Sequence, residues 1–430
     1  MSKPPKLPPG LVGELAQWIN DTAGKPQPML ALGASIAYVG ALASKRYQAI
    51  DSTRPNIYCI GVGVSGCGKE HARKQIKRLT AAAGVGEILG GEEVTSDAAI
   101  EMELARHDGR LLYMWDEIGH MFGAMKSQRA SSSAQKIIPM LMRMSTSSSS
   151  TYQGKTYASK EDARTIIDQP HLCLYGTTVP GRLYEGMDSS EMQDGWLGRV
   201  LVFESKDDPL RNRKACLDDT IPQSLIDQVR AINDHQPNMD GFGDIAATTA
   251  CNPTKIPFTV PADEELDMWN AYYHEQKKGS IKAGDGYEAL WARGCEIGTK
   301  VALIVAVGDG AAAISQEHAQ FGCQLFLDRM QDFIKSAKGE VGDSEGERIR
   351  KKMYKVIKAG AKNGATLSAI TRVSQSINRQ QRMNLLRELE DMEHAFGIKN
   401  DGRRGETYYS FKHRDPSDFA DSAQVSSSES

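Results

Sequence analysis

Residues 63–70 read Gly-Val-Ser-Gly-Cys-Gly-Lys-Glu, between the apolar run Ile57–Val62 and the helix-periodic segment His71–Ala83. Glycines let a backbone turn its N–H groups around phosphate oxygens, and the dipole of a following helix adds positive potential. A lysine at the end of such a loop reaches the β- and γ-phosphates of a nucleotide. The order of strand, glycine loop and helix therefore predicts a P-loop, and the alternative is a glycine-rich turn with a solvated lysine. The residues expected at the phosphates are Gly63, Ser65, Gly66, Cys67, Gly68, Lys69 and Glu70.

The residue after the lysine departs from the usual pattern of such loops. A Ser or Thr normally supplies a hydroxyl ligand for Mg²⁺ at this position, whereas this chain has Glu70. A carboxylate is a good Mg²⁺ ligand, but it is longer and adds negative charge beside the phosphates. Three interpretations stay open. Glu70 ligates the metal directly or through water, or it points away and leaves Ser65 or a water to serve, or hydrolysis is slow.

A second apolar run, Leu111–Trp115, ends in two carboxylates that lie about a helix, a strand and a turn beyond the lysine of the loop. This is the Walker B pattern, in which the first carboxylate holds Mg²⁺ and the second polarises the attacking water. The sequence therefore predicts hydrolysis of ATP with Mg²⁺, with Asp116 as the metal ligand and Glu117 as the catalytic carboxylate. A solvated strand end without chemistry is the alternative.

Short apolar runs alternate with helical segments between residues 56 and 204, which predicts an α/β fold with a parallel sheet covered by helices. The strand candidates are Ile57–Val62, Leu111–Trp115, Leu172–Tyr175 and Arg199–Glu204. The expected regions are an N-terminal helical region (1–50), a P-loop ATPase core (51–257), a helical lid (258–342), a C-terminal module (343–414) and a disordered acidic tail (415–430).

Polar and basic residues follow the acidic strand end in a definite order. A third apolar run ends in Thr177 and Thr178, a fourth begins at Arg199, and Arg293 lies in a helical segment further on. This order resembles that of AAA+ ATPases. The resemblance implies that Thr177 or Thr178 is a polar sensor, that Arg199 is a finger acting on a neighbouring subunit's nucleotide, and that Arg293 is a second sensor. The alternatives are a simple turn, a strand-edge arginine and a salt-bridged surface arginine.

Six segments between residues 11 and 335 carry a narrower resemblance. They are PQPMLALGASIAYVGALASKRY, GVSGCGKEHARK, WDEIGHMFG, PHLCLYGTT, DGWLGRVLVFE and WARGCEIGTKVALIVAV. Together they are similar to the phage and prophage replication ATPases, a primase/helicase C-terminal-like family of unknown function related to superfamily 3 and minichromosome maintenance helicases. The resemblance implies a homo-oligomeric ring, expected to be a hexamer, that works on DNA. It also places priming on a separate primase or polymerase.

A candidate hairpin lies between the second and third apolar runs, at Ser149–Lys160. Tyr152 and Tyr157 flank Gln153-Gly154-Lys155, which has the composition of a hairpin turn between β-formers. In the helicases that the chain resembles, an insertion at this point carries a basic residue into the central pore. Lys155 is therefore expected to hold a phosphate of single-stranded DNA, with tyrosines available for stacking. A surface hairpin that only packs is the alternative.

Positive charge is concentrated near the C-terminus. Residues 346–414 contain 16 Lys and Arg and 7 Asp and Glu, a net of +9, while the whole chain carries −3. Three predicted helices followed by two short strands around a basic tip have the outline of a winged helix, which reads DNA with its recognition helix and wing. The residues expected to contact duplex DNA are Arg379, Arg382, Arg403 and Arg404. A winged helix used for protein contacts is the alternative.

The remaining features bound the setting of the protein. Seven single cysteines without a CxxC pair fit a reducing cytoplasm, expected to be that of a bacterial host cell. The runs Met29–Ala43 and Ile297–Val307 are expected to be too short and too rich in small residues to span a bilayer, so no membrane partner is expected. The main hypothesis is an ATP-dependent DNA helicase or translocase of phage or mobile-element replication. The alternatives are an ATP-switched DNA-binding initiator, helicase loader or regulator, and, more weakly, a nucleotide kinase.

Overall fold

In the computed structural model the chain forms two compact units, Met1–Lys338 and Gly339–Ser430. The structure describes residues 5–119, 121, 134–156, 164–186, 195–212, 214, 220–236, 252–340, 345–399, 406–415 and 417. The predicted disordered tail lies almost wholly outside these residues, as do Tyr157, Arg403 and Arg404. The predicted N-terminal region, core and lid belong to a single unit, because the N-terminal helices pack directly on the sheet.

The first unit is a mixed assembly of helices and short strands. Its helices are α1 (Gly10–Asp21), α2 (Pro28–Ala43), α3 (His71–Ala83), α4 (Asp97–Arg106), α6 (Ile137–Thr146), α7 (Pro180–Gly186), α9 (Gln223–Asn233), α10 (Val260–Ala283), α11 (Glu288–Trp291), α12 (Gly294–Gly308) and α13 (Gln316–Glu340). Its strands are β1 (Tyr47–Ala49), β2 (Tyr58–Gly63), β3 (Arg110–Trp115), β4 (Thr151–Tyr152), β5 (Ile167–Asp168), β6 (His171–Thr178), β7 (Val200–Ser205) and β8 (Thr254–Ile256).

Four parallel strands form the central sheet in the order β3-β6-β2-β7. The predicted α/β fold with a parallel sheet is therefore confirmed. Strand β6 lies between β2 and β3, and Val62 of β2 pairs with Thr178 while Trp115 of β3 pairs with Gly176. The carboxyl ends of the three strands consequently meet at one edge of the sheet. Strand β6 is longer than predicted, so Thr177 lies within it and not after it.

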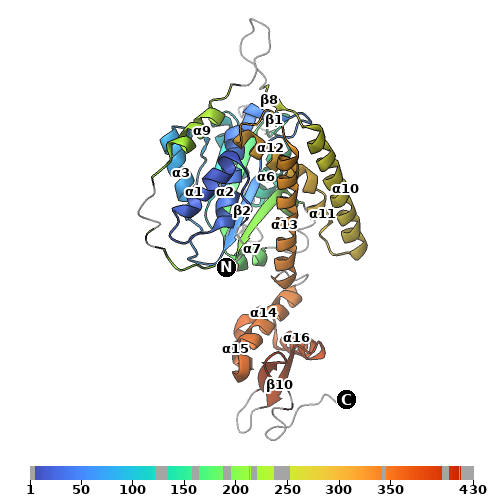
Figure 1. Cartoon of the computed structure of the whole chain (residues 1–430). Coiled ribbons are helices and arrows are strands. Elements are labelled where there is room, and N and C mark those ends of the chain that lie inside the picture. The colour runs from blue at the N-terminus through green and yellow to red at the C-terminus, as the bar shows by residue number, and fades with distance from the viewer. Residues whose placement is uncertain are drawn as a thin grey trace. The chain divides into compact units, whose positions relative to one another are not determined.

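Helix α2 lies against the sheet and contacts β2, β6 and β7 (Figure 1). Two glycines permit this approach, because a Cβ at Gly33 would lie 2.6 Å from the Phe203 ring and one at Gly40 would lie 2.7 Å from the Pro55 carbonyl. The stretch Pro28–Arg46 is long and apolar enough to cross a membrane, contrary to the length argument from sequence, but 89% of its most apolar window is buried within the fold. Such burial is that of a core helix.

The second unit combines three helices with a small antiparallel sheet. Its elements are α14 (Glu345–Ala359), β9 (Ala365–Thr366), α15 (Leu367–Val373), α16 (Arg379–Asp391), β10 (Ala395–Lys399) and β11 (Glu406–Ser410), with strand order β10-β11-β9. A core of its own includes Met353, Ile370, Leu386 and Tyr408. Asn378 begins α16 with a reciprocal capping box, a motif that stabilises a helix start.

Candidate nucleotide site

The carboxyl ends of β2, β3 and β6 bring the predicted nucleotide-site residues together. The glycine loop follows β2, Asp116 and Glu117 follow β3, and Thr177 and Thr178 end β6. The three segments are far apart in sequence, and the register of the parallel strands aligns their ends. Polar groups that converge outside the carboxyl ends of parallel strands are the usual setting for a ligand site in an open α/β sheet.

Lys69 and Glu117 contact each other directly. The lysine is only 8% exposed, and its Nζ forms an ion pair with Glu117 Oε1. The other carboxylate oxygen of Glu117, Oε2, is buried and accepts no hydrogen bond from the described residues. Glu117 also has φ +46°, a left-handed conformation that is unusual for a residue with a side chain. The fold therefore keeps this carboxylate in the site in spite of backbone strain.

Asp116 is fully engaged by donors from three elements. Its Oδ1 accepts hydrogen bonds from the Thr177 hydroxyl at 2.8 Å and from the Glu117 backbone N–H at 3.1 Å. Its Oδ2 lies 2.6 Å from Nη2 of Arg73 on α3. Burial raises the pKa of Asp116, but the Thr177 hydrogen bond and the Arg73 charge lower it more, so its pKa lies below the ordinary value. The carboxylate is thus charged at neutral pH.

The two threonines that were predicted as alternatives differ in their contacts. Thr177 donates to Asp116. Thr178 is fully buried and its hydroxyl makes no hydrogen bond within the described part of the chain. An unsatisfied buried hydroxyl beside a predicted ligand site is a group that a ligand or a water would satisfy.

The glycine loop is held from outside by the segment between α1 and α2. The Lys25 ammonium donates to the Gly66 carbonyl at 2.9 Å, and the buried Gln27 amide donates to the Cys67 carbonyl at 2.9 Å. Gly68 has φ +95°, and a Cβ there would lie 2.9 Å from the Lys25 carbonyl. Because a trans peptide points its N–H opposite to its C=O, fixing the Cys67 carbonyl also fixes the direction of the Gly68 N–H.

Lys25, Gln27 and Arg73 were missed by the sequence reasoning. Lys25 and Gln27 precede the loop by about 40 residues and leave no local pattern. Arg73 lies on the first turn of α3, only four residues after Lys69, and that closeness to the loop lysine was a usable signal.

Glu70 is exposed at the start of α3, and its side chain forms neither a cap nor an ion pair with the residues that the structure describes. Ser65 is also exposed. All three interpretations of Glu70 stay predictions.

The residues at this edge fit Mg²⁺, a hard cation that prefers oxygen ligands. Asp116 supplies carboxylate oxygens at the strand end, and Glu117 Oε2 and the Thr178 hydroxyl are buried oxygens without a partner among the described residues. The site has the donor chemistry for a metal bound with a nucleotide.

Arg199 and Arg293 lie at the opposite edge of the sheet. Arg199 ends the 3-10 helix Leu197–Arg199 and directly precedes Val200, which pairs with Tyr58 at the start of β2. Six residues of β2 separate this edge from the glycine loop, which corresponds to about 20 Å of extended strand. Arg293 therefore does not reach the nucleotide site of its own chain from this position.

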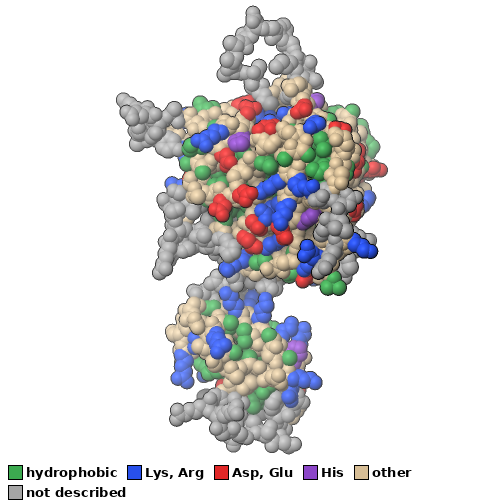
Figure 2. Space-filling view, turned by 90° about the vertical axis from the view of Figure 1, so that its left-hand side faces the viewer, with side chains coloured by type: hydrophobic (Ala, Val, Ile, Leu, Met, Phe, Trp, Pro, Cys, Tyr) green, Lys and Arg blue, Asp and Glu red, His purple; other side chains and the backbone are tan. Residues whose placement is uncertain are grey.

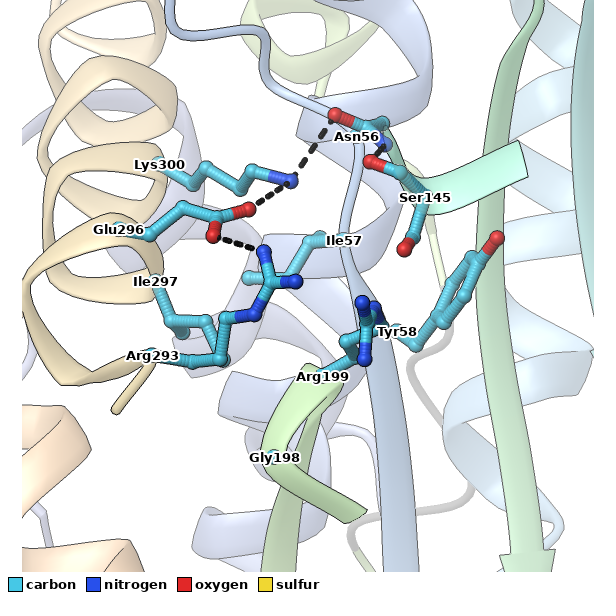
Figure 3. A pocket seen from close by; sticks show the side chains of 10 residues that line it. All are labelled: Asn56, Ile57, Tyr58, Ser145, Gly198, Arg199, Arg293, Glu296, Ile297 and Lys300. Carbon is cyan, nitrogen blue, oxygen red and sulfur yellow. Dashed lines mark hydrogen bonds and ion pairs between the residues drawn. The ribbon is translucent and has the colours of Figure 1, made fainter. Parts of the chain in front are cut away.

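Both guanidinium groups point into one small cavity (Figure 3). Burial and the charge of Arg293 lower the pKa of Arg199, whose Nη1 donates to the Gly195 carbonyl at 2.7 Å. Glu296 forms ion pairs with Arg293 and with Lys300, the latter at 3.4 Å. Glu296 is thus paired with two cations, and Arg199 lines the same cavity.

The structure contradicts the predicted hairpin turn around Lys155. Tyr152 pairs with Ile167 in the antiparallel pair β4–β5, so a long connection and not a turn at residues 153–155 joins these strands. The Lys155 ammonium lies 2.8 Å from the Asp97 carboxylate and 3.4 Å from that of Glu101, both on α4. Burial lowers the pKa of Lys155, but these carboxylates raise it more. In this conformation the lysine is held against α4 and is not a free loop tip.

Arg379 and Arg382, two of the predicted DNA contacts, differ in their surroundings. Arg379 is exposed at the first position of α16 and has no partner among the described residues. Arg382 instead donates to the Ser374 hydroxyl at 2.6 Å and to the Ser374 and Ile377 carbonyls at 2.8 and 3.1 Å. Its guanidinium therefore fixes the turn between α15 and α16, because most of its donors are already used.

Comparison of the sequence with protein-family models and with curated proteins finds no match. The functional assignment consequently depends on the residues and geometry described above.

Proposed function

We propose that the chain is a P-loop ATPase of the AAA+ type, which works as a homo-oligomeric ring on DNA. The observation that carries this proposal is the meeting of Lys69, Glu117, Asp116 and Thr177 at the carboxyl ends of three parallel strands. Strand β6 lies between the strand that carries the lysine loop and the strand that carries the acidic pair. A nucleoside triphosphate is the ligand whose charge and length suit this arrangement.

The side chains divide the work of hydrolysis as follows. Lys69 leaves Glu117 and turns to the β- and γ-phosphates, which releases the Glu117 carboxylate. Glu117 then accepts a hydrogen bond from the attacking water, and Thr177 keeps Asp116 in place. Mg²⁺, when bound at Asp116, neutralises charge on the phosphates. The Lys69–Glu117 pair thereby keeps the catalytic carboxylate engaged until a nucleotide enters.

The position of Arg199 and Arg293 supports a second copy of the chain as the partner. They lie about 20 Å from their own glycine loop, which suits contact with a nucleotide held by a neighbouring subunit. Arg199 would then face the neighbour's terminal phosphate. A head-to-tail contact of this kind closes into a ring, and we expect a hexamer.

The second unit supports DNA as the substrate on which the ring acts. Figure 2 shows Lys and Arg side chains over the visible surface of this unit with few acidic ones, and residues 346–414 within it carry a net charge of +9. Three helices and a three-stranded antiparallel sheet agree with a winged helix. We infer an ATP-dependent helicase or translocase of phage or mobile-element replication in a bacterial cytoplasm, with a separate primase or polymerase as partner.

One observation favours the second candidate function, an ATP-switched initiator, loader or regulator. Lys155, the residue expected to grip single-stranded DNA, is paired with Asp97 and Glu101. A helicase requires a conformation in which this lysine, or another basic group, is released to the strand.

The two candidates are separated by the response of hydrolysis to DNA. We expect single-stranded DNA to stimulate ATP hydrolysis by the full chain and the protein to unwind a forked duplex. The measurement combines steady-state phosphate release with strand separation of a labelled fork. An equal rate of ATP hydrolysis with and without DNA, together with a fork that is not unwound, would support the ATP-switched initiator, loader or regulator.

The second unit offers a matched pair for testing duplex contact. Arg379→Gln should weaken duplex binding and lower the slope of log affinity against log salt by about one, because one phosphate contact is lost. Arg382→Gln removes the same charge from a group that is engaged within the unit, so it should lower thermal stability and leave the salt slope nearly unchanged. The checks are salt titrations of duplex binding and melting curves. Equal salt slopes for Arg379→Gln and the unmodified protein would point to a protein-binding role.

A further inference from the structure

Arg73 is a buried cation inside the nucleotide site that the motif pattern does not explain. It is 8% exposed, and its Nη2 lies 2.6 Å from Asp116 Oδ2. Its Nε is buried and has no hydrogen-bond partner among the described residues. The next residue, Lys74, is exposed and carries the same charge. The position of Arg73 is therefore specific to the acidic strand end.

We propose that Arg73 is a built-in cation that stands in for Mg²⁺ at Asp116 and lets the chain bind a nucleoside triphosphate before the metal. Arg73 gives up Asp116 when Mg²⁺ binds and turns its free donors to the phosphates. This inference rests on the proposed ATPase function and assigns the order of binding at the same site.

The first argument is charge balance. A triphosphate that enters this site without metal meets the carboxylates of Asp116, Glu117 and Glu70, and like charges in a partly buried site repel one another. Lys69 balances one carboxylate and Arg73 balances a second. Without Arg73, the metal-free site would lose a positive charge next to the incoming phosphates.

The second argument is competition for one oxygen. Asp116 Oδ1 already accepts two hydrogen bonds, from Thr177 and from the Glu117 N–H, so Oδ2 is the oxygen left for a metal. Arg73 occupies that oxygen in the free chain. The guanidinium and the metal, or its bound water, therefore compete, and removal of Arg73 must make Asp116 more available.

The third argument is the residue after Lys69. The sequence lacks the hydroxyl that usually helps to hold Mg²⁺ there and has the exposed Glu70 instead. Because the neutral hydroxyl ligand is missing, a cation of the protein is needed more to balance the phosphate charge before Mg²⁺ binds. Once released, the planar guanidinium has several N–H donors that suit phosphate oxygens.

These arguments predict two opposite effects of Arg73→Gln. Binding of a fluorescent ATP analogue in EDTA should weaken by about tenfold, because a cation beside the phosphates is lost. The Mg²⁺ concentration that gives half of the metal-dependent gain in analogue binding should fall several-fold. Arg73→Lys should weaken binding in EDTA by no more than about threefold, because the charge remains although the planar set of N–H donors is lost. Lys74→Gln is the control and should change neither quantity.

The experiment is an analogue titration of the full-length chain, in EDTA and across a Mg²⁺ series, for all four proteins. A purely structural role for Arg73 predicts that both quantities worsen together or that neither moves, and either result overturns the proposal. Should circular dichroism show that Arg73→Gln is unfolded, the decision passes to Arg73→Lys, and tenfold weaker binding in EDTA for that folded variant would overturn it. Lys69→Ala separates a failure of the proposed function from a failure of the Arg73 proposal, because full analogue binding by that variant would refute the ATPase assignment itself.

Discussion

Lys69→Ala is expected to lower ATP affinity by about 100-fold or more, because the variant loses the only cation of the loop that reaches the phosphates. Glu117→Gln is expected to bind ATP close to normally and to lower turnover by about 10²- to 10⁴-fold, the usual contribution of a positioned base. The glutamine keeps the size of the side chain and still fits the left-handed backbone position as well as glutamate does. Equilibrium binding and single-turnover hydrolysis measure the two effects separately.

The structure adds a secondary expectation for these variants. Lys69 and Glu117 pair with each other, so each substitution leaves its partner without a counter-charge in the free chain. Both variants should therefore be somewhat less stable without nucleotide, and nucleotide should rescue only Glu117→Gln. Lys25→Met is a useful comparison, because it loosens the loop without removing the phosphate-binding cation. Wild-type turnover by Glu117→Gln would show that the acidic strand end has no catalytic part.

Arg199→Ala is expected to abolish hydrolysis, by about 10³-fold or more, while each chain still binds ATP at its own loop. The reason is the position of Arg199 at the edge of the sheet opposite to that loop. Mixing Arg199→Ala with Glu117→Gln should restore part of the activity. In mixed rings, an intact Arg199 from one chain meets an intact Glu117 site on its neighbour.

The control for this mixture is Arg199→Ala combined with a chain that carries both Arg199→Ala and Glu117→Gln. No interface in that mixture contains an Arg199, so recovery there would have another cause. Subunit exchange is confirmed by differently labelled chains that co-purify. A mixture of the two single variants that exchanges subunits at all ratios and stays inactive would argue against a shared site.

Local sequence patterns predicted well which segments meet at the carboxyl ends of the parallel strands. Strand β2, the glycine loop and α3 are consecutive in the chain, so composition alone indicated their order. The alignment of Asp116 with Thr177 followed from parallel strands ending at one edge, and the structure places them 2.8 Å apart. These features depend on the secondary-structure propensity of short segments and on the geometry of parallel sheets, and both can be predicted from local sequence patterns.

Contacts between distant segments were harder to foresee. Lys25 and Gln27 bind the loop across about 40 residues, and the packing of α1 and α2 against the rest of the first unit brings them there. The segment around Lys155 has the composition of a turn, yet the position of the lysine is determined by its ion pairs with two carboxylates on α4. A charged side chain is placed by its partners, and a partner far away in sequence leaves no periodic signal.

The left-handed backbone at Glu117 has a consequence for how this protein tolerates change. Glycine would adopt φ +46° more easily than glutamate does, but it would leave the buried Lys69 ammonium without its counter-charge. The backbone conformation and the ion pair therefore favour different residues at position 117. A comparison of variants at this position for heat resistance alone would show which of the two contributions is larger, whereas under the proposed function only a carboxylate there would support hydrolysis.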